Sequence, residues 1–521
     1  MLTFGHLVQR NGRNWADKAA FVELDRRVTW GEFDQRTDRL GHALRKMNVR
    51  SGDRVAILSS DCIEVAEVFT ACAKIGAVRV GLNARFAPRE IAALIADCAP
   101  DAIFVQRSYL KTFRDSLPIA DRQTNDAFAL NIVGFGPGDD GADYETLIDE
   151  CANLGPLQQT PSDIVMIAYT TGSTGLPKGA IYPHAKFLNS IIYTALCEGI
   201  EFDARWLHAM PAAGIPIMHM LRNIFHGATT VIVGPWEAEK ALVLMERERT
   251  TNTVLVPTML NSLLECDRLS NHDTSSMRLM GYGASPLPPA TIREAMSIFK
   301  CPFLQMYGTT ELMGMSMMLT PEDHQLGVTS RPDILASAGK ALPFVDLRIV
   351  DEDGKDVGSG ETGELIVRSE VQFEQYWNAP EKTAETLKDG WLYTGDIARR
   401  DADGYIFLSD RAKFRIKTGG YLVFPTEVEN VLAEHPAINE VAVVGLPDPR
   451  WGDRIHAVVS LTAGQSVTPA ELRDFCKDKI ATFKIPKSID IWADIPKGAT
   501  GKIQKRNIID FYAASANKAA E

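Results

Sequence analysis

The sequence lacks several features that would assign it to a special class of protein. None of its 8 cysteines forms a Cys-x-x-Cys pair, which argues against a zinc site and a disulfide framework. No stretch approaches the ~20 apolar residues of a membrane span, and the first residues hold no signal-peptide core. Acidic residues outnumber basic ones by 67 to 55, and the net charge of −12 argues against nucleic-acid binding. These absences predict a cytoplasmic protein with reduced, mostly buried thiols.

The remaining composition is that of an ordinary globular protein. The 521 residues are 45% hydrophobic and 23% charged, which favours two to four domains with large cores. Predicted strands at 53–58, 78–83 and 102–105 alternate with helical stretches such as 62–77. This rhythm predicts parallel sheets covered by helices.

The pattern changes in the last third of the chain. Residues 345–369 are β-rich with Asp-Gly and glycine turns, which predicts a smaller antiparallel sheet or barrel. After 409–417, a helix at 426–434, further strands, a second helix and a lysine-rich tail predict a separate domain of usual size. We therefore expect an α/β fold, with a large N-terminal domain (1–412) of stacked α/β sheets plus a β-rich subdomain. A small C-terminal α+β domain (413–521) follows.

The stretch YTTGSTGLPKG, residues 169–179, is a candidate phosphate-binding loop. It lies between an apolar strand pattern and further regular structure, whereas a free linker has polar flanks. Glycines let backbone N–H groups converge on one point, and hydroxyls add donors for phosphate oxygens. The spacing is not that of a Walker loop. A surface turn with one solvated lysine, Lys178, is the alternative.

A second motif is QMYGTTE, residues 305–311. Tyr307 and Gly308 allow a planar ring to stack where the backbone comes close. Thr309 and Thr310 offer hydroxyls, and Glu311 offers a hard oxygen ligand for Mg²⁺. A capped helix start is the alternative interpretation.

Two further motifs carry charge. Asp396 lies in a Thr-Gly-Asp turn, where its carboxylate can accept both ribose hydroxyls, and Arg411 follows about one strand later. Stabilisation of a β-rich turn is the alternative for this pair. Lys502 lies in a glycine turn near the C-terminus, and a solvated tail lysine is the alternative there.

Taken together, these ordered motifs resemble the adenylate-forming superfamily of acyl-CoA synthetases, luciferases and peptide-synthetase adenylation domains. The resemblance covers nearly the whole chain, from VTWGEFDQRTDRLGHAL to the turn that holds Lys502. It implies ATP, Mg²⁺ and coenzyme A as cofactor and co-substrates.

The resemblance also implies a role for each matching residue. Thr310 would contact the α-phosphate, Glu311 would position Mg²⁺, and Lys502 would neutralise charge as the carboxylate attacks. Asp396 and Arg411 would bind the ribose. The other nucleotide-binding residues would be Thr170, Thr171, Gly172, Ser173, Thr174, Gly175 and Lys178 at the β- and γ-phosphates, Gly283, Ala284, Ser285 and Tyr307 around the adenine, and in addition Gly308 and Thr309.

The two half-reactions imply a mobile C-terminal domain. Lys413 matches the hinge position of the family. The segment that holds Lys417, Gly419 and Gly420 would enter the site for the second step, where the glycines leave room for a thiol arm.

The chain departs from its family where the acyl group would lie. Many relatives carry Pro-x-x-His or an aromatic residue, whereas Ala212, Ala213 and Gly214 follow a proline here. Small residues predict a wide pocket for a bulky or branched acid, unless His219 or a neighbour fills the space. Met313 would line this pocket if its stretch is extended, and core packing is the alternative. No aspartate lies between 205 and 234, which disfavours an amino acid as substrate.

The sequence therefore predicts an ATP- and Mg²⁺-dependent carboxylate–CoA ligase that acts on a small-molecule carboxylic acid. An acyl-AMP ligase that loads an acyl carrier protein is one alternative. A non-catalytic nucleotide- or acyl-binding protein is the other. Fatty, aryl and polycyclic acids all stay open, and so does the oligomeric state, a homodimer included.

Overall fold

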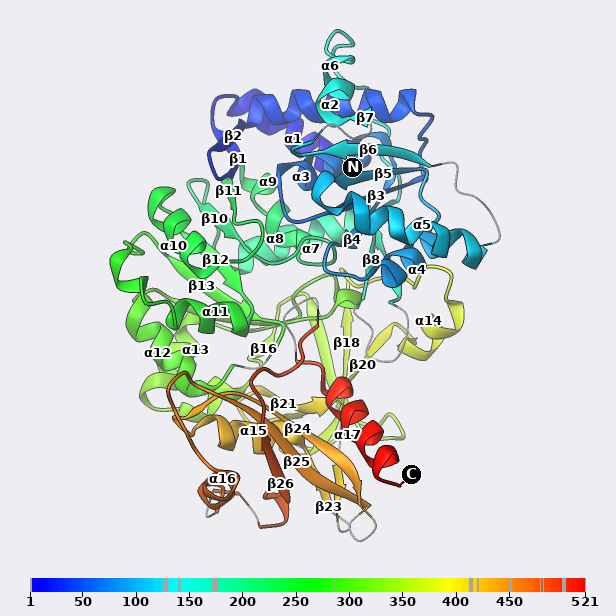
Figure 1. Cartoon of the computed structure of the whole chain (residues 1–521). Helices are drawn as coiled ribbons and strands as arrows, with labels where there is room; N and C mark the ends of the chain where they lie inside the picture. The colour runs from blue at the N-terminus through cyan, green and yellow to red at the C-terminus, as the bar shows by residue number, and fades with distance from the viewer. Residues whose placement is uncertain are drawn as a thin grey trace.

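The computed structural model describes most of the chain (Figure 1). The described residues are 2–124, 130–138, 142–170, 177–285, 287–411, 416–418, 421–448, 452–477, 479–480, 482–498 and 503–520.

A seven-stranded sheet in the N-terminal part has the order β7-β6-β5-β3-β4-β8-β9. All neighbours are parallel except the antiparallel pair β8–β9. The strands are β3 (Arg54–Ser59), β4 (Val78–Asn83), β5 (Ala102–Gln106), β6 (Asn131–Phe135), β7 (Ala142–Asp143), β8 (Ile164–Tyr169) and β9 (Gly179–Pro183).

A nine-stranded sheet has the order β16-β15-β14-β13-β12-β10-β11-β1-β2. Its central strands are parallel, while β2, β15 and β16 pair antiparallel at the edges. The strands are β1 (Ala19–Glu23), β2 (Arg26–Thr29), β10 (Arg205–His208), β11 (Thr229–Ile232), β12 (Asn252–Leu255), β13 (Leu279–Gly283), β14 (Phe303–Tyr307), β15 (Met317–Leu319) and β16 (Lys340–Ala341).

Helices pack between and around these sheets. Every residue of α3 is buried, and α3 contacts β1 of one sheet and β3 and β4 of the other, so it lies between the layers. The helix α2 begins at a capping box, in which Thr29 and Glu32 satisfy each other's backbone N–H groups. The helices are α1 (Phe4–Asn14), α2 (Trp30–Lys46), α3 (Ile63–Ile75), α4 (Pro88–Cys98), α5 (Leu110–Thr124), α6 (Tyr144–Asp149), α7 (His184–Cys197), α8 (Ile217–Leu221), α9 (Asn223–His226), α10 (Ala238–Arg247), α11 (Pro257–Leu264), α12 (Pro289–Phe299) and α13 (Pro321–Thr329).

Two smaller sheets complete the chain. The β-rich subdomain is antiparallel throughout its described pairs, and the C-terminal sheet has one parallel pair, β25–β26. The C-terminal sheet lies at the end of the molecule opposite the seven-stranded sheet (Figure 1). The elements are β17 (Val345–Val350), β18 (Thr362–Ser369), α14 (Pro380–Thr386), β19 (Leu387–Lys388), β20 (Trp391–Arg400), β21 (Ile406–Arg411), β22 (Ile416–Thr418), β23 (Tyr421–Val423), α15 (Pro425–Ala433), β24 (Ile438–Asp448), β25 (Gly452–Leu461), α16 (Pro469–Phe475), β26 (Ser488–Ile491) and α17 (Lys505–Ala520).

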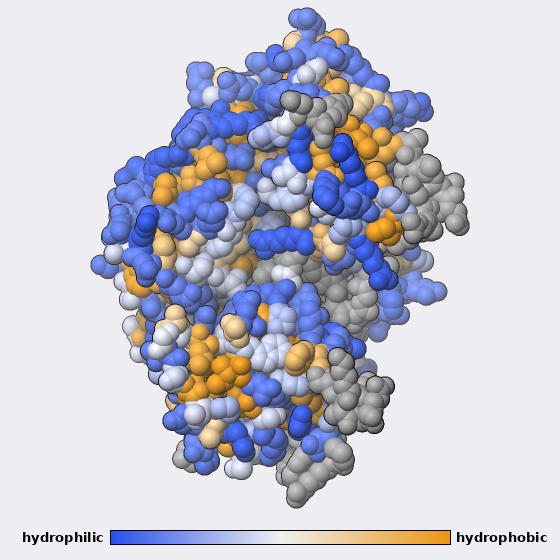
Figure 2. All heavy atoms as spheres, in the orientation of Figure 1, coloured by the Kyte–Doolittle hydropathy of each residue, from blue (hydrophilic) through white to orange (hydrophobic). Residues whose placement is uncertain are grey.

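The predicted fold class is confirmed: large α/β sheets, a β-rich subdomain and a small C-terminal α/β unit follow one another. The predicted domain boundary at 412/413 lies outside the described residues and stays a prediction. In the described ranges, no helix has both the length and the apolar character to cross a membrane. Figure 2 shows hydrophilic residues over most of one face, with smaller hydrophobic patches among them.

Candidate active site

The glycine loop closes a hairpin within the seven-stranded sheet. Strand β8 ends at Tyr169, which pairs with Gly179 at the start of β9. The Thr170 N–H donates to the Lys178 carbonyl at 2.9 Å, and the Lys178 N–H donates to the Thr170 hydroxyl at 3.3 Å. The predicted residues Thr171, Gly172, Ser173, Thr174 and Gly175 lie outside the described residues. Two paired strands thus fix the neck of the loop, so it is not a free linker, and its binding of phosphate stays a prediction.

The motifs predicted to bind the base lie together at the carboxyl ends of the neighbouring strands β13 and β14. Gly283 ends β13 and pairs with Met306 of β14, so Ala284 and Ser285 follow beside Tyr307. A Cβ at Gly283 would lie 2.5 Å from the Met306 carbonyl oxygen, and one at Gly308 would lie 1.6 Å from the Gly314 oxygen. The carboxyl ends of parallel strands are where α/β sheets bind ligands.

The motif predicted to bind the ribose reaches these strand ends from the β-rich subdomain. The Tyr307 hydroxyl donates to Asp396 Oδ2 at 2.5 Å. Asp396 in β20 pairs with Arg411 in β21, so the two predicted ribose residues are backbone neighbours. The side chain of Arg411 lies outside the described part of the structure. Gly395 has a φ of 72°, which lets the chain turn immediately before Asp396.

The Thr-Thr-Glu segment follows β14 and is held from two sides. Tyr182 in β9 donates its hydroxyl to the Thr310 carbonyl at 2.5 Å. Tyr376 donates its hydroxyl to Glu311 Oε1 at 2.6 Å, and the Phe373 N–H donates to the Glu311 carbonyl at 2.8 Å. The Thr309 hydroxyl is buried and has no hydrogen-bond partner among the described residues. A buried donor of this kind is available to a ligand.

The donor set fits Mg²⁺ bound through a nucleotide. Within the described residues, no group of 3 or more His, Cys, Asp and Glu side chains could hold a metal alone. Mg²⁺ is commonly bound by one or two carboxylates together with substrate phosphates. Tyr376 bonds Glu311 and lies beside Lys178 at the end of the glycine loop, so Glu311 is a suitable single protein ligand.

The predicted acyl turn is clamped by buried charged residues that the sequence analysis missed. The Arg79 guanidinium in β4 donates to the Ala212 carbonyl at 2.9 Å and the Ala213 carbonyl at 3.0 Å. The Ala212 N–H donates to Asp61 Oδ1 at 2.8 Å. A Cβ at Gly81 would lie 2.0 Å from the Ala213 oxygen, so only glycine allows this approach. Burial lowers the pKa of Arg79 to about 10.

His219 belongs to a separate buried cluster on α8 and β10. Its ring stacks on Trp206 with centroids 6.2 Å apart, and Arg222 lies 3.9 Å from the Trp206 centroid. Arg222 also bonds His219 and forms an ion pair with Glu198. Burial and the nearby Arg222 charge lower the pKa of His219, and burial raises the pKa of Glu198. These contacts fix His219 against β10.

Met313 does not meet the condition set for it. It has a φ of 53° and Gly314 has a φ of 129°, so the chain turns there, and only Met317–Leu319 is a strand. The Ser190 hydroxyl donates to the Met313 carbonyl at 2.6 Å. The stretch is therefore not extended at Met313, because the chain turns after Glu311, and the buried Met313 side chain accords with the alternative of core packing. The place of Met313 in an acyl pocket stays a prediction.

Most site residues predicted in the C-terminal domain lie outside the residues that the structure describes. Lys413, Gly419, Gly420 and Lys502 lie outside the described residues. For Lys417 the backbone is described, in β22.

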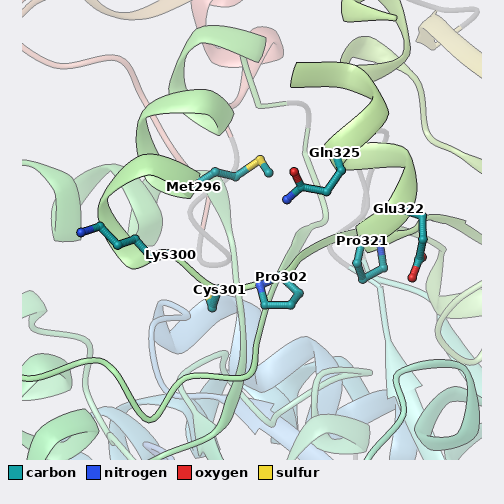
Figure 3. Close-up of a pocket in the computed structure, with 7 residues that line it drawn as sticks. All are labelled: Met296, Lys300, Cys301, Pro302, Pro321, Glu322 and Gln325. Atoms are coloured by element: carbon teal, nitrogen blue, oxygen red, sulfur yellow. The ribbon is translucent and has the colours of Figure 1, made fainter. Parts of the chain in front are cut away.

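A surface hollow of about 340 Å³ lies elsewhere (Figure 3). Its lining includes Lys300 after α12, Pro302 immediately before β14, and Glu322 in α13. It therefore opens at the end of β14 opposite Tyr307 and is distinct from the predicted nucleotide site.

The missed residues left different signals in the sequence. Arg79 is a charged residue within the apolar strand pattern of β4, which is buried throughout, and such a residue is seldom buried without a partner. This pattern could have predicted a specific role for Arg79. Tyr376 offered no such signal, because its contact with Glu311 joins residues 65 positions apart.

Comparison with known proteins gives two family matches. Residues 8–377 match the AMP-binding enzyme family, and residues 427–502 match the AMP-binding enzyme C-terminal domain. The chain is 31% identical to ScoC, a fatty acid–acyl-carrier-protein ligase of Streptomyces coeruleorubidus, over 95% of this chain and 93% of ScoC. It is 32% identical to indoleacetate–CoA ligase of Aromatoleum aromaticum, over 96% of this chain and 98% of that ligase. The structure of the anthranilate CoA ligase AuaEII in complex with anthranoyl-AMP has a TM-score of 0.89, at 28% identity over 98% of each chain.

Proposed function

This chain belongs to the AMP-binding enzyme family and is an adenylate-forming ligase, and from that premise we propose that it joins a carboxylic acid to coenzyme A. The observation that carries the proposal is the set of contacts that joins three sheets at one place. Tyr307 of the nine-stranded sheet bonds Asp396 of the β-rich subdomain, and Tyr182 of the seven-stranded sheet bonds Thr310. Tyr376 bonds Glu311, and its ring lies beside the Lys178 ammonium at the neck of the glycine loop.

The first half-reaction would form an acyl adenylate. A carboxylate oxygen bonds to the α-phosphorus of ATP, and the bond to the β-phosphate oxygen breaks, which releases pyrophosphate. Both reactants are anionic, so positive charge and oriented donors lower the barrier. Bound Mg²⁺, with Glu311 as its protein ligand, would supply positive charge that offsets the phosphates. Lys178 and Lys502 would add their ammonium groups, and Thr310 would contact the α-phosphate.

The nucleotide would be held where the nine-stranded sheet and the β-rich subdomain meet. Gly283, Ala284 and Ser285 would border the adenine together with the Tyr307 ring. Asp396 and Arg411 would bind the ribose hydroxyls, and the Tyr307 hydroxyl bond at 2.5 Å supports a fixed Asp396 carboxylate. The buried Thr309 hydroxyl would donate to the nucleotide.

The second half-reaction would make the thioester. The thiol sulfur bonds to the acyl carbon, the bond from that carbon to the AMP oxygen breaks, and the thiol proton passes to solvent. Lys413 would act as the hinge that brings Lys417, Gly419 and Gly420 to the site. AMP is the leaving group, so no protein nucleophile is needed.

The acid would lie against the clamped turn. Ala212, Ala213 and Gly214 offer little side-chain volume, which favours a bulky or branched acid. The related indoleacetate–CoA ligase supports an aryl acid and CoA as acceptor. The related ScoC supports the second candidate, transfer to a carrier protein.

The experiment is a screen of fatty, aryl and polycyclic acids for ATP-dependent pyrophosphate release. Each active acid is then offered free CoA, a phosphopantetheinylated carrier protein or a simple amine as acceptor. Acyl-CoA formation supports the proposal. Turnover only with the carrier protein selects the second candidate, and an absence of pyrophosphate with every acid supports the non-catalytic binding protein.

A further inference from the structure

Tyr376 contacts both charged groups that the proposed reaction places around the triphosphate. Its hydroxyl donates to Glu311 Oε1 at 2.6 Å, and the Lys178 ammonium lies 4.8 Å from its ring centroid. We propose that Tyr376 is a positioning residue that holds the Glu311 carboxylate for Mg²⁺ and the Lys178 ammonium for the phosphates. This inference rests on the proposed function.

The backbone around Tyr376 is fixed to β9, directly after Lys178. The Ile181 N–H donates to the Gln375 carbonyl at 3.0 Å, and the Trp377 N–H donates to the Gly179 carbonyl at 2.6 Å. Ala180 and Tyr376 form a bridge between these two bonds. The Tyr376 N–H donates to the Thr383 hydroxyl at 3.0 Å. Tyr376 is therefore a rigid attachment point.

The hydroxyl of Tyr376 forms a hydrogen bond with only one of the two carboxylate oxygens of Glu311. The side chain is 4% exposed, so its bond to Oε1 competes little with water. A tyrosine hydroxyl is protonated at neutral pH, so it can only donate to the Glu311 carboxylate. No described residue bonds Oε2, so this oxygen is left for a metal ion. Partners of this kind orient a metal ligand, and their loss typically weakens metal binding 10–100-fold.

The ring of Tyr376 forms a cation–π contact with the Lys178 ammonium. A lysine ammonium within about 6 Å of an aromatic centroid is attracted by the negative face of the ring. Lys178 is half-buried and lies at the end of the glycine loop, where its backbone is bonded to Thr170. The ring thus limits where the ammonium can go, while the hydroxyl at its edge fixes the carboxylate.

Tyr182 provides a matched control. It is also a buried tyrosine and also bonds the Thr310–Glu311 dipeptide, but its hydroxyl donates to the Thr310 carbonyl and not to the carboxylate. A purely structural role for such hydroxyls predicts similar behaviour for Tyr182→Phe and Tyr376→Phe. A positioning role predicts different behaviour, because only Tyr376 touches the metal-binding group.

The test measures ATP binding directly, by calorimetry of the full chain at a series of MgCl₂ concentrations and without MgCl₂. We expect Tyr376→Phe to raise the MgCl₂ concentration for half-maximal ATP affinity about tenfold, from the effect of such partners on metal affinity. Tyr182→Phe should leave this midpoint within about twofold. Tyr376→Phe should have no further effect in a Glu311→Gln background, since coupled residues are not additive.

A second variant separates the ring from the hydroxyl. Tyr376→Leu should also weaken ATP binding without MgCl₂, whereas Tyr376→Phe should not, because phenylalanine keeps the ring for Lys178. An unchanged MgCl₂ midpoint in Tyr376→Phe, or an equal shift in Tyr182→Phe, would overturn the inference while leaving the proposed function intact. If the wild-type protein binds no ATP, with or without MgCl₂, then both the inference on Tyr376 and the proposed function are wrong.

Discussion

The bonds from Arg79 to the predicted acyl turn give a prediction in which binding of the acid changes and binding of ATP does not. Arg79→Met keeps an unbranched side chain in the buried site but removes both bonds to the Ala212 and Ala213 carbonyls. The turn should then lose its fixed position against β4. Among the described side chains, Arg79 bonds none of Lys178, Asp396 and Glu311, so the predicted nucleotide site should be unaffected.

The size of the effect follows from these contacts. Each buried carbonyl left without its donor costs about 1–3 kcal/mol. Part of this cost is offset, because the variant no longer has to desolvate a cation whose pKa burial lowers to about 10. We expect the free energy of unfolding to fall by about 1–3 kcal/mol. For the acid we expect KM to rise about tenfold, which corresponds to about 1.4 kcal/mol of binding.

The assay is pyrophosphate release with the acid varied at saturating ATP, and then with ATP varied at saturating acid. Arg54→Met is the matched control, because Arg54 also bonds two consecutive carbonyls, those of Cys98 and Ala99, at 3.0 and 2.8 Å. Arg79→Met should raise KM for the acid and leave KM for ATP within about twofold, and Arg54→Met should change neither. Equal increases in both constants, or an effect as large in Arg54→Met, would refute the reasoning.

Three further predictions address the rest of the molecule. Lys502→Ala should lose acyl-adenylate formation by orders of magnitude yet still make thioester from supplied acyl-AMP, and equal loss in both assays would show that its assigned role is wrong. Tyr307→Phe removes the hydroxyl that orients the Asp396 carboxylate, so KM for ATP should rise about tenfold, or about 1.4 kcal/mol, and an unchanged KM would show that this bond does not orient Asp396 for the nucleotide. Burial lowers the pKa of His324 to about 4. Its unfolded pKa is about 6.5, so the unfolded chain binds more protons between these values and stability should fall as pH falls. His324→Gln should reduce this slope by up to about 1.4 kcal/mol per pH unit in chemical denaturation, and identical slopes would contradict the assignment.

The parts of the fold that follow from local pattern could be read from the sequence. The strand predicted at 78–83 is β4, and the helix predicted at 62–77 is α3 at Ile63–Ile75. Where the local pattern was weak, elements were missed. A proline at 118 lies inside α5, and the lysine-rich tail forms α17, which packs through the buried Ile508. Tertiary contacts decide such segments, and spacing alone does not reveal them.

The residues of the candidate site also fall into those that the local sequence predicts and those that only tertiary contacts reveal. Asp396 and Glu311 stand in short motifs whose residue types suit ribose and metal, so their roles could be predicted from the local sequence and stay predictions. The contacts that hold them could not be predicted in this way, because Tyr307 reaches Asp396 across 89 positions and Tyr376 reaches Glu311 across 65. Arg79 acts across more than 130 positions on the Ala212 and Ala213 carbonyls. Such contacts depend on which strands become neighbours.

The most direct test of adenylation follows an oxygen atom. An acid that the enzyme uses as substrate is labelled with ¹⁸O in both carboxylate oxygens and converted in the presence of ATP and acceptor. The ¹⁸O content of each product is then measured by mass spectrometry. Attack on the α-phosphorus, followed by release of AMP from the acyl carbon, predicts one ¹⁸O atom in AMP and none in pyrophosphate. ADP together with labelled inorganic phosphate would instead place the attack at the terminal phosphate and contradict the account.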